Sequence, residues 1–174
     1  MLASASTIEV VAEAFRRHKV SLSVVDPVFT PNIASEDVFY LIFQVMASTS
    51  GAQLLQENAI DTLCKRILPL TTILTPNIPE AKLLLKNSGI SFKEPEGVED
   101  VIAIAKAVQK LGPKYVFLKG GHLPLTKNRL VSKEEADRNI VLNVLHGDGQ
   151  TMLMETDYLN SRNTHGTGCS LACR

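Results

Sequence analysis

Two glycines flank a threonine near the end of the chain, in the run Gly166-Thr167-Gly168-Cys169. Small and apolar residues follow this run and predict the start of a helix. Backbone N–H groups at such a start can converge on an anion and stabilise the charge of a transferring phosphoryl group. Cys169 would lie in the first helical turn, where the dipole favours a thiolate that can act on a reacting hydroxyl. The pattern therefore indicates phosphoryl transfer, with an ordinary helix start as the alternative.

The cysteines allow a second hypothesis, a metal site. His165, Cys169 and Cys173 recur every four residues, which could place three ligands along one helix face. No fourth ligand is apparent, and His165 precedes the glycines that would start the helix, so we favour the phosphate site. Cys64 falls in an apolar helical pattern and is interpreted as core packing. Three cysteines do not make a disulfide framework and are expected to stay thiols in a reducing compartment.

Further polar residues follow short apolar runs that read as buried strands. The predicted strands cover 21–25, 70–74 and 115–118. The polar residues and glycines in the segments that follow them are Asp26, Asn77, Glu80, Lys119, Gly120 and Gly121. In an open α/β sheet, ligands bind outside the carboxyl ends of the strands. We therefore expect these residues to lie close together.

Predicted helices alternate with those strands, at 7–18, 52–68 and 98–111. This alternation predicts one α/β domain with a mostly parallel, doubly wound sheet flanked by helices. Residues 140–146 and 151–156 read as two further strands joined by Gly147-Asp148-Gly149, so an antiparallel edge is expected. The charged stretch 126–139 is predicted to be a solvated flap or loop.

Composition excludes several function classes. The 174 residues are 45% hydrophobic, and 18 basic side chains balance 18 acidic ones, so no charge imbalance predicts a nucleic acid or membrane partner. No apolar stretch is long enough for a membrane span, and the first residues lack the pattern of a signal peptide. A cytoplasmic location is the expectation.

The motifs together resemble the ribokinase-like superfamily and, within it, the hydroxymethylpyrimidine and phosphomethylpyrimidine kinases of thiamine biosynthesis, closest to the fungal enzymes. The resemblance rests on Val-Val-Asp-Pro-Val at 24–28, Thr-Ser-Gly-Ala-Gln-Leu-Leu at 49–55, Leu-Thr-Pro-Asn at 74–77, Lys-Gly-Gly-His at 119–122 and His-Gly-Thr-Gly-Cys at 165–169. It implies phosphorylation of 4-amino-5-hydroxymethyl-2-methylpyrimidine and its monophosphate with ATP and Mg²⁺. The alternatives are a pyridoxal-type kinase and a non-catalytic truncated product. Cys169 favours the pyrimidine kinases, because aspartate stands there in most similar sugar and pyridoxal kinases.

The resemblance also implies roles for single residues. Cys169 is the expected base facing the substrate hydroxyl, next to the amides of Gly166, Thr167 and Gly168. Asp26 and Glu80 would bind Mg²⁺ through water. The expected nucleotide-binding residues are Asn77, Lys119, Gly120 and Gly121. Asn77 and Glu80 also form the pattern of a helix cap and its capping-box partner, and the two roles can coexist.

Compared with the family pattern, the chain lacks a Gly-rich first segment and stops about two turns into the helix that carries Cys169. We therefore interpret residues 1–174 as a partial kinase domain, incomplete at both ends, with little or no activity alone and with homo-oligomeric full-length relatives. Residues 29–45 are extra to the pattern. We interpret them as a retained intron or a misjudged exon boundary, with a surface insertion as the alternative.

Overall fold

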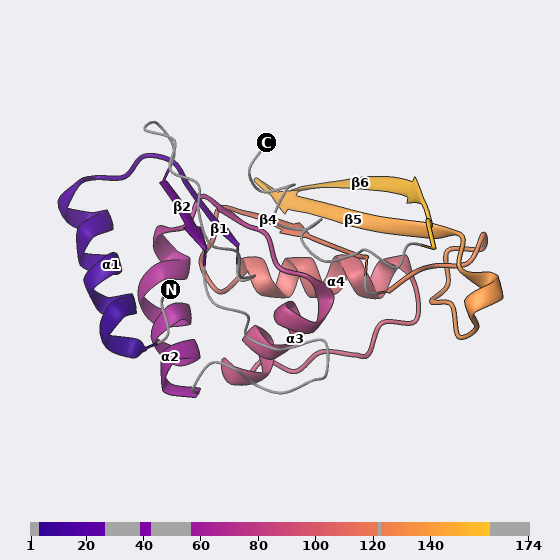
Figure 1. Ribbon diagram of the computed structural model, residues 1–174, viewed down its shortest axis with the longest axis horizontal. Coiled ribbons are helices and arrows are strands. Elements are labelled where there is room, and N and C mark those ends of the chain that lie inside the picture. The colour runs from indigo at the N-terminus through magenta and orange to yellow at the C-terminus, as the bar shows by residue number, and fades with distance from the viewer. Residues whose placement is uncertain (1–3, 27–38, 43–56, 122, 161–174) are drawn as a thin grey trace.

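The computed structural model describes residues 4–26, 39–42, 57–121 and 123–160 (Figure 1). The main elements, in chain order, are α1 (Ala5–Arg17), β1 (Ser23–Asp26), β2 (Phe39–Ile42), α2 (Glu57–Thr62), β3 (Ile73–Leu74), α3 (Ile78–Asn87), α4 (Val98–Gln109), β4 (Tyr115–Leu118), β5 (Ile140–Gly147) and β6 (Gln150–Asp157). A π-helical turn (Leu63–Ile67) and a 3₁₀ turn (Leu68–Leu70) extend α2, and a second 3₁₀ turn covers Glu135–Asp137.

The six strands of the described residues form one mixed sheet in the order β2-β1-β3-β4-β5-β6. The first four strands in this order are parallel, whereas β5 and β6 join as an antiparallel edge. Both the parallel core and the antiparallel edge are predicted from the sequence. Because β1, β3 and β4 are neighbours and point the same way, their carboxyl ends meet at one edge of the sheet.

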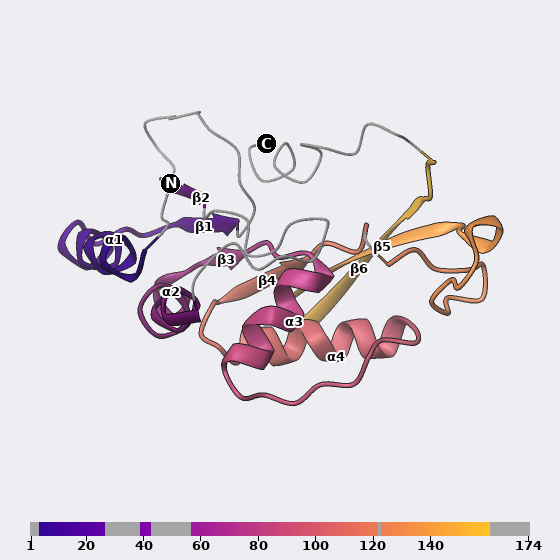
Figure 2. The ribbon, with the colours of Figure 1, turned by 60° about the horizontal axis from the view of Figure 1, so that its bottom comes forward.

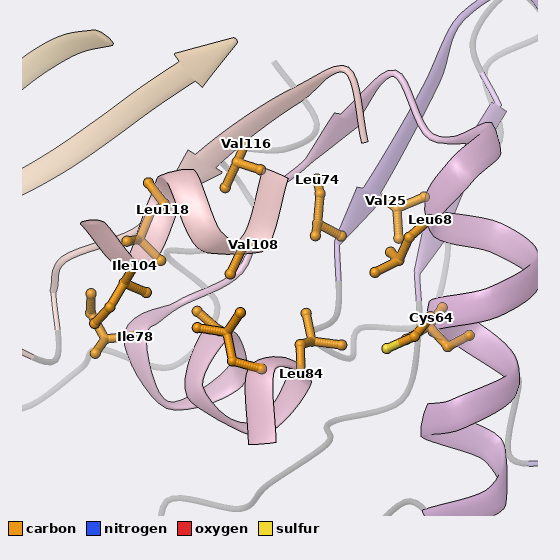
Figure 3. Close-up of a cluster of buried hydrophobic side chains, with 14 of the residues drawn as sticks. Val25, Cys64, Leu68, Leu74, Ile78, Leu84, Ile104, Val108, Val116 and Leu118 are labelled. Carbon is orange, nitrogen blue, oxygen red and sulfur yellow. The ribbon is translucent and has the colours of Figure 1, made fainter. Parts of the chain in front are cut away.

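Helices α2, α3 and α4 lie on one face of this sheet, and α1 lies beside its β1–β2 end (Figure 2). Helix α4 packs on β4 and β5, while α1 packs against α2. Val25 of β1, Leu74 of β3 and Val116 of β4 are fully buried. They meet Leu84 of α3 and other apolar side chains in a single core (Figure 3). This layer fixes the positions of the strand ends.

Local chemistry sets the ends of the elements. Helix α1 begins at Ala5, two residues before the predicted start at residue 7. Ser4 caps it, with the Thr7 N–H donating to Ser4 Oγ at 3.3 Å. The hairpin between β5 and β6 turns at Asp148 (φ 49°) and Gly149 (φ 75°), as its sequence predicts. None of the described helices is long and apolar enough to cross a membrane.

Two strand predictions need correction. The predicted strand 70–74 contains only Ile73 and Leu74 as strand, because the preceding residues form a 3₁₀ turn closed by the Thr71 N–H bond to Leu68 O at 3.1 Å. Strand β2 lies within residues 29–45, for which the sequence predicts no strand, and it pairs in parallel with β1. A short apolar run can form either a strand or part of a loop, and its own sequence does not distinguish the two. The other residues of 29–45 lie outside the described part of the chain.

Candidate active site

The carboxyl ends of β1, β3 and β4 bring predicted site residues together. Asp26 is the last residue of β1, and Lys119 follows β4 directly. The Lys119 ammonium donates a hydrogen bond to Asp26 Oδ1 at 3.0 Å, and the two side chains are 10% and 5% exposed. The sequence predicts that Asp26 and Lys119 lie at the same edge of the sheet. The structure shows in addition that they form a buried ion pair.

Asn77 and Glu80 lie at the start of α3, which follows β3. Glu80 N–H donates to Asn77 Oδ1 at 2.9 Å, and Asn77 N–H donates to Glu80 Oε2 at 2.7 Å. This reciprocal pair is the predicted capping box. Asn77 also forms a parallel bridge with Lys119, whose N–H donates to Pro76 O at 2.8 Å. The cap therefore fixes the Glu80 carboxylate beside the ion pair.

Glu80 is almost completely buried, and its environment changes its protonation. Burial raises the pKa of Glu80 from 4.5 to about 7. The hydrogen bond from the Asn77 backbone and the charge of Lys119 lower this pKa, while the charge of Asp26 raises it further. Desolvation outweighs the favourable contacts, so Glu80 exchanges a proton near neutral pH.

The oxygen donors at this edge fit the predicted magnesium site. Asp26 and Glu80 are buried carboxylates within electrostatic range of each other. The Thr75 hydroxyl, at the end of β3, is buried with no hydrogen-bond partner among the described residues. Mg²⁺ prefers such oxygens and keeps several waters, so two carboxylates suffice. The described part of the chain holds no group of three or more His, Cys, Asp or Glu that could form a fuller metal cage.

The two glycines after Lys119 differ in their surroundings. A Cβ on Gly120 would lie 1.8 Å from the Leu142 carbonyl oxygen of β5, so this position tolerates no side chain. The Gly120 N–H donates to Asn143 Oδ1 at 3.1 Å. Gly121 is exposed, and a Cβ there would meet nothing within 4 Å. Close packing on β5 therefore explains Gly120 in this structure, and a phosphate contact at either glycine stays a prediction.

A sequence profile of the family described as phosphomethylpyrimidine kinase matches residues 1–174. The chain belongs to this family. It is 35% identical over 172 residues to a candidate hydroxymethylpyrimidine/phosphomethylpyrimidine kinase of Schizosaccharomyces pombe, covering 99% of this chain and 28% of that protein. The enzyme of the same name from Haemophilus influenzae is 34% identical, with 99% and 52% covered. The chain thus spans about half or less of the length of these relatives.

Solved structures agree with the fold. A Bacillus subtilis pyridoxal kinase matches with a TM-score of 0.68 and 26% identity, covering 99% of this chain and 52% of that one. A phosphomethylpyrimidine kinase of Clostridium difficile matches with a TM-score of 0.59 and 29% identity, covering 88% and 50%. The predicted ribokinase-like α/β fold is confirmed.

Several predicted residues of this kinase fold lie outside the described part of the chain. They are Gly166, Thr167, Gly168 and Cys169, together with His165 and Cys173 of the alternative metal hypothesis. Their roles stay predictions. Cys64 is buried in the core, as expected, and burial raises the pKa of its thiol.

Sequence reasoning gave no role to Thr75 or Asn143, which the structure places at the site. Thr75 has a buried hydroxyl beside the end of β1, where its N–H donates to Val25 O at 2.9 Å. Asn143 receives the hydrogen bond from Gly120 described above. An asparagine inside the otherwise apolar run 140–145 is the signal that could have identified Asn143.

Proposed function

We propose that the protein transfers phosphate from ATP to 4-amino-5-hydroxymethyl-2-methylpyrimidine and to its monophosphate, a step of thiamine biosynthesis. The observation that carries this proposal is the family match over residues 1–174. The buried polar cluster of Asp26, Lys119 and Glu80 supports it, because phosphoryl transfer depends on positioned charges more than on covalent chemistry.

The residues of the site would have different roles in the reaction. Asp26 and Glu80 would hold Mg²⁺, which neutralises charge on the nucleotide phosphates when bound. The capping box keeps the Glu80 carboxylate in place at the start of α3. From the sequence, Cys169 would accept the proton of the substrate hydroxyl, and the amides of Gly166 to Gly168 would stabilise the developing negative charge.

A pyridoxal-type kinase is the second candidate function. The observation in its favour is the structural match to the B. subtilis pyridoxal kinase, which was solved as an ADP complex and gives a higher TM-score than the C. difficile phosphomethylpyrimidine kinase. Cys169, at a position where aspartate is usual in pyridoxal kinases, favours the pyrimidine substrate.

One assay separates these functions. The protein, as its gene encodes it, is incubated with Mg-ATP and either the hydroxymethylpyrimidine or pyridoxal, and ADP release is followed by a coupled reaction. We expect faster turnover with the pyrimidine. Turnover with pyridoxal alone would replace the proposal by the second candidate, and no turnover with either substrate would favour a non-catalytic product.

The role of Cys169 has its own test. Cys169→Ala should lower kcat on the pyrimidine by about 10²–10⁴-fold, because a base acting on the attacking hydroxyl is lost. The affinity for ATP should change little. Wild-type turnover in this variant would place Cys169 in the core instead.

A further inference from the structure

Strand β5 is longer than β4 and supports the loop that follows β4. The two strands pair as far as Leu118, which lies opposite Val144. The earlier residues of β5, 140–143, lie instead beside the loop after β4. In this loop, Leu125 both donates a backbone hydrogen bond to Ile140 and accepts one from it, at 2.8 and 3.0 Å. The start of β5 therefore holds the segment that carries two of the expected nucleotide-binding residues.

Asn143 makes a polar side-chain contact between this part of β5 and the loop. Its Oδ1 accepts a hydrogen bond from the Gly120 N–H at 3.1 Å. Side chains of a strand alternate between the two faces of the sheet, and the neighbours Leu142 and Val144 are buried in the core, which α4 covers. Asn143 therefore belongs to the opposite face, where it is half-buried. Packing of the core does not require an asparagine at this position.

Gly120 is held on both sides of its peptide unit. Asn143 accepts its N–H, and its carbonyl oxygen accepts a hydrogen bond from the Leu123 N–H at 2.8 Å. The next residue, Gly121, is exposed, and its N–H forms no hydrogen bond within the described part of the chain. An exposed backbone N–H two residues after the buried Lys119 is a suitable donor to an anion. The bond from Gly120 to Asn143 thus fixes the backbone directly before this donor.

We propose that Asn143 is a positioning residue for nucleotide binding, whose side-chain oxygen holds Gly120 so that the Gly121 N–H stays in place for a phosphate of ATP. The inference rests on the proposed function, because it assigns a task in the same site. It adds to the roles expected of Lys119, Gly120 and Gly121 and changes none of them. Without this oxygen, the Gly120 N–H would need water as its acceptor. The loop would then adopt further conformations, and only a fraction of the molecules would be ready to bind ATP.

The test compares four variants of the protein as its gene encodes it. Asn143→Leu removes the acceptor at similar side-chain size, whereas Asn143→Asp keeps an acceptor oxygen. Asn143→Ser is the second removal variant, because its hydroxyl is too short to reach Gly120, and it serves if leucine disturbs the fold. Asn139→Leu is the matched control. It makes the same substitution just before β5, where the Asn139 amide donates to Asp137 O at 2.6 Å.

Each variant is measured for the calorimetric Kd of Mg-ATP, the KM of the pyrimidine, amide exchange at Gly120 and the midpoint of thermal unfolding. We expect Asn143→Leu and Asn143→Ser to raise the Kd of Mg-ATP about tenfold, as when the binding-competent fraction falls to about a tenth. Amide exchange at Gly120 should be faster in both. The KM of the pyrimidine should stay within about threefold of wild type, because its contacts are not removed. Asn143→Asp and Asn139→Leu should keep the Kd of Mg-ATP within about threefold, since both retain an acceptor for Gly120.

Three results would overturn the inference. The first is a Kd of Mg-ATP or an amide exchange rate at Gly120 that is unchanged in a folded removal variant. The second is an equal rise of Kd in Asn143→Asp or Asn139→Leu, which would show that the acceptor oxygen is not the cause. The third is failure of both removal variants to fold, which would give Asn143 a role in folding instead. Because Kd and amide exchange need no acceptor substrate, they decide the inference even if turnover on the pyrimidine is absent and the proposed function fails.

Discussion

Strand β4 has a lysine at each end, and the two lysines lie in opposite environments. Lys114 precedes the strand beside the β5–β6 turn, where it is 59% exposed and lies 3.9 Å from an equally exposed Asp148. Lys119 follows the strand, where it is buried against Asp26 at 3.0 Å. Between them lie only the four residues Tyr115–Leu118. The lysine at one end of β4 is therefore exposed to solvent, and the lysine at the other end is part of a buried polar site.

The difference follows from the direction of the strands. At the carboxyl end of β4, three parallel strands deliver Asp26, Thr75 and Lys119 to one buried edge. At the other end, β4 meets the tight turn of the antiparallel hairpin, where Tyr115 Oη donates to Asp148 Oδ2. Exposed pairs contribute little to stability, whereas buried polar groups must be matched. Substitutions at the site end should therefore have larger effects than matched substitutions at the hairpin end.

The largest effect on stability is expected for Gly120→Ala at the site end. A Cβ there would lie 1.8 Å from Leu142 O, which is backbone and can move only if β5 shifts. We expect a loss of about 4 kcal/mol in the free energy of unfolding, measured by urea denaturation. Gly121→Ala is the matched control, since nothing lies within 4 Å of its Cβ. Equal stability of the two variants would contradict the close approach.

Glu80 makes the stability of the folded protein depend on pH. Its pKa is about 7 in the folded protein and 4.5 in the unfolded chain, so the folded state holds the proton more tightly. The resulting stabilisation is complete below pH 4.5 and is lost as pH rises through 7. It amounts to roughly 3 kcal/mol in the free energy of unfolding. Denaturation curves at several pH values, recorded with a chelator present, measure it.

Glu80→Gln is the control for this pH dependence. The amide cannot ionise, so the fall in stability between pH 4.5 and 7.5 should be smaller by that amount. Gln can still accept the hydrogen bond from the Asn77 N–H, which keeps the capping box. An unchanged pH profile in this variant would show that Glu80 is ionised throughout the range.

Local patterns in the sequence account for much of this architecture. The bounds of β4 are predicted without error, because a short apolar run stands between clear turn signals. The capping box of Asn77 and Glu80 and the Asp148-Gly149 turn are also predicted, since each depends on neighbouring residues only.

Features that depend on strand order could not be predicted in the same way. The sequence places Asp26 and Lys119 at one edge, but their pairing across β3 requires the order of the sheet. The contact of Gly120 with Leu142 also joins distant segments. Strand β2 was missed because nothing local in the sequence separates a strand that pairs with β1 from an apolar loop.

A smaller effect is expected at the hairpin end for Gly149→Ala. Gly149 has a φ of 75°, a left-handed conformation that alanine adopts at a cost of about 1–2 kcal/mol. Nothing lies within 4 Å of its Cβ, so the strain is purely conformational. Urea denaturation should show this loss, clearly below that of Gly120→Ala. Gly149→Asn is the control and should lose less, because asparagine tolerates this region and suits the turn. Equal losses for alanine and asparagine would argue against conformational strain.

The smallest effect is expected for Lys114→Met, at the hairpin end of β4. Lys114 is well exposed, its ion pair with Asp148 is 3.9 Å long, and its ammonium lies 5.1 Å from the centroid of the Tyr115 ring. Exposed ion pairs and exposed cation–π contacts each contribute at most about 1 kcal/mol. The apolar stem of methionine keeps the packing on Tyr115, so the net change in the free energy of unfolding should stay below about 1 kcal/mol. It should shrink further in 1 M salt, because screening already weakens the pair in the wild type. A loss as large as that of Gly120→Ala would remove the distinction between the two ends of the strand.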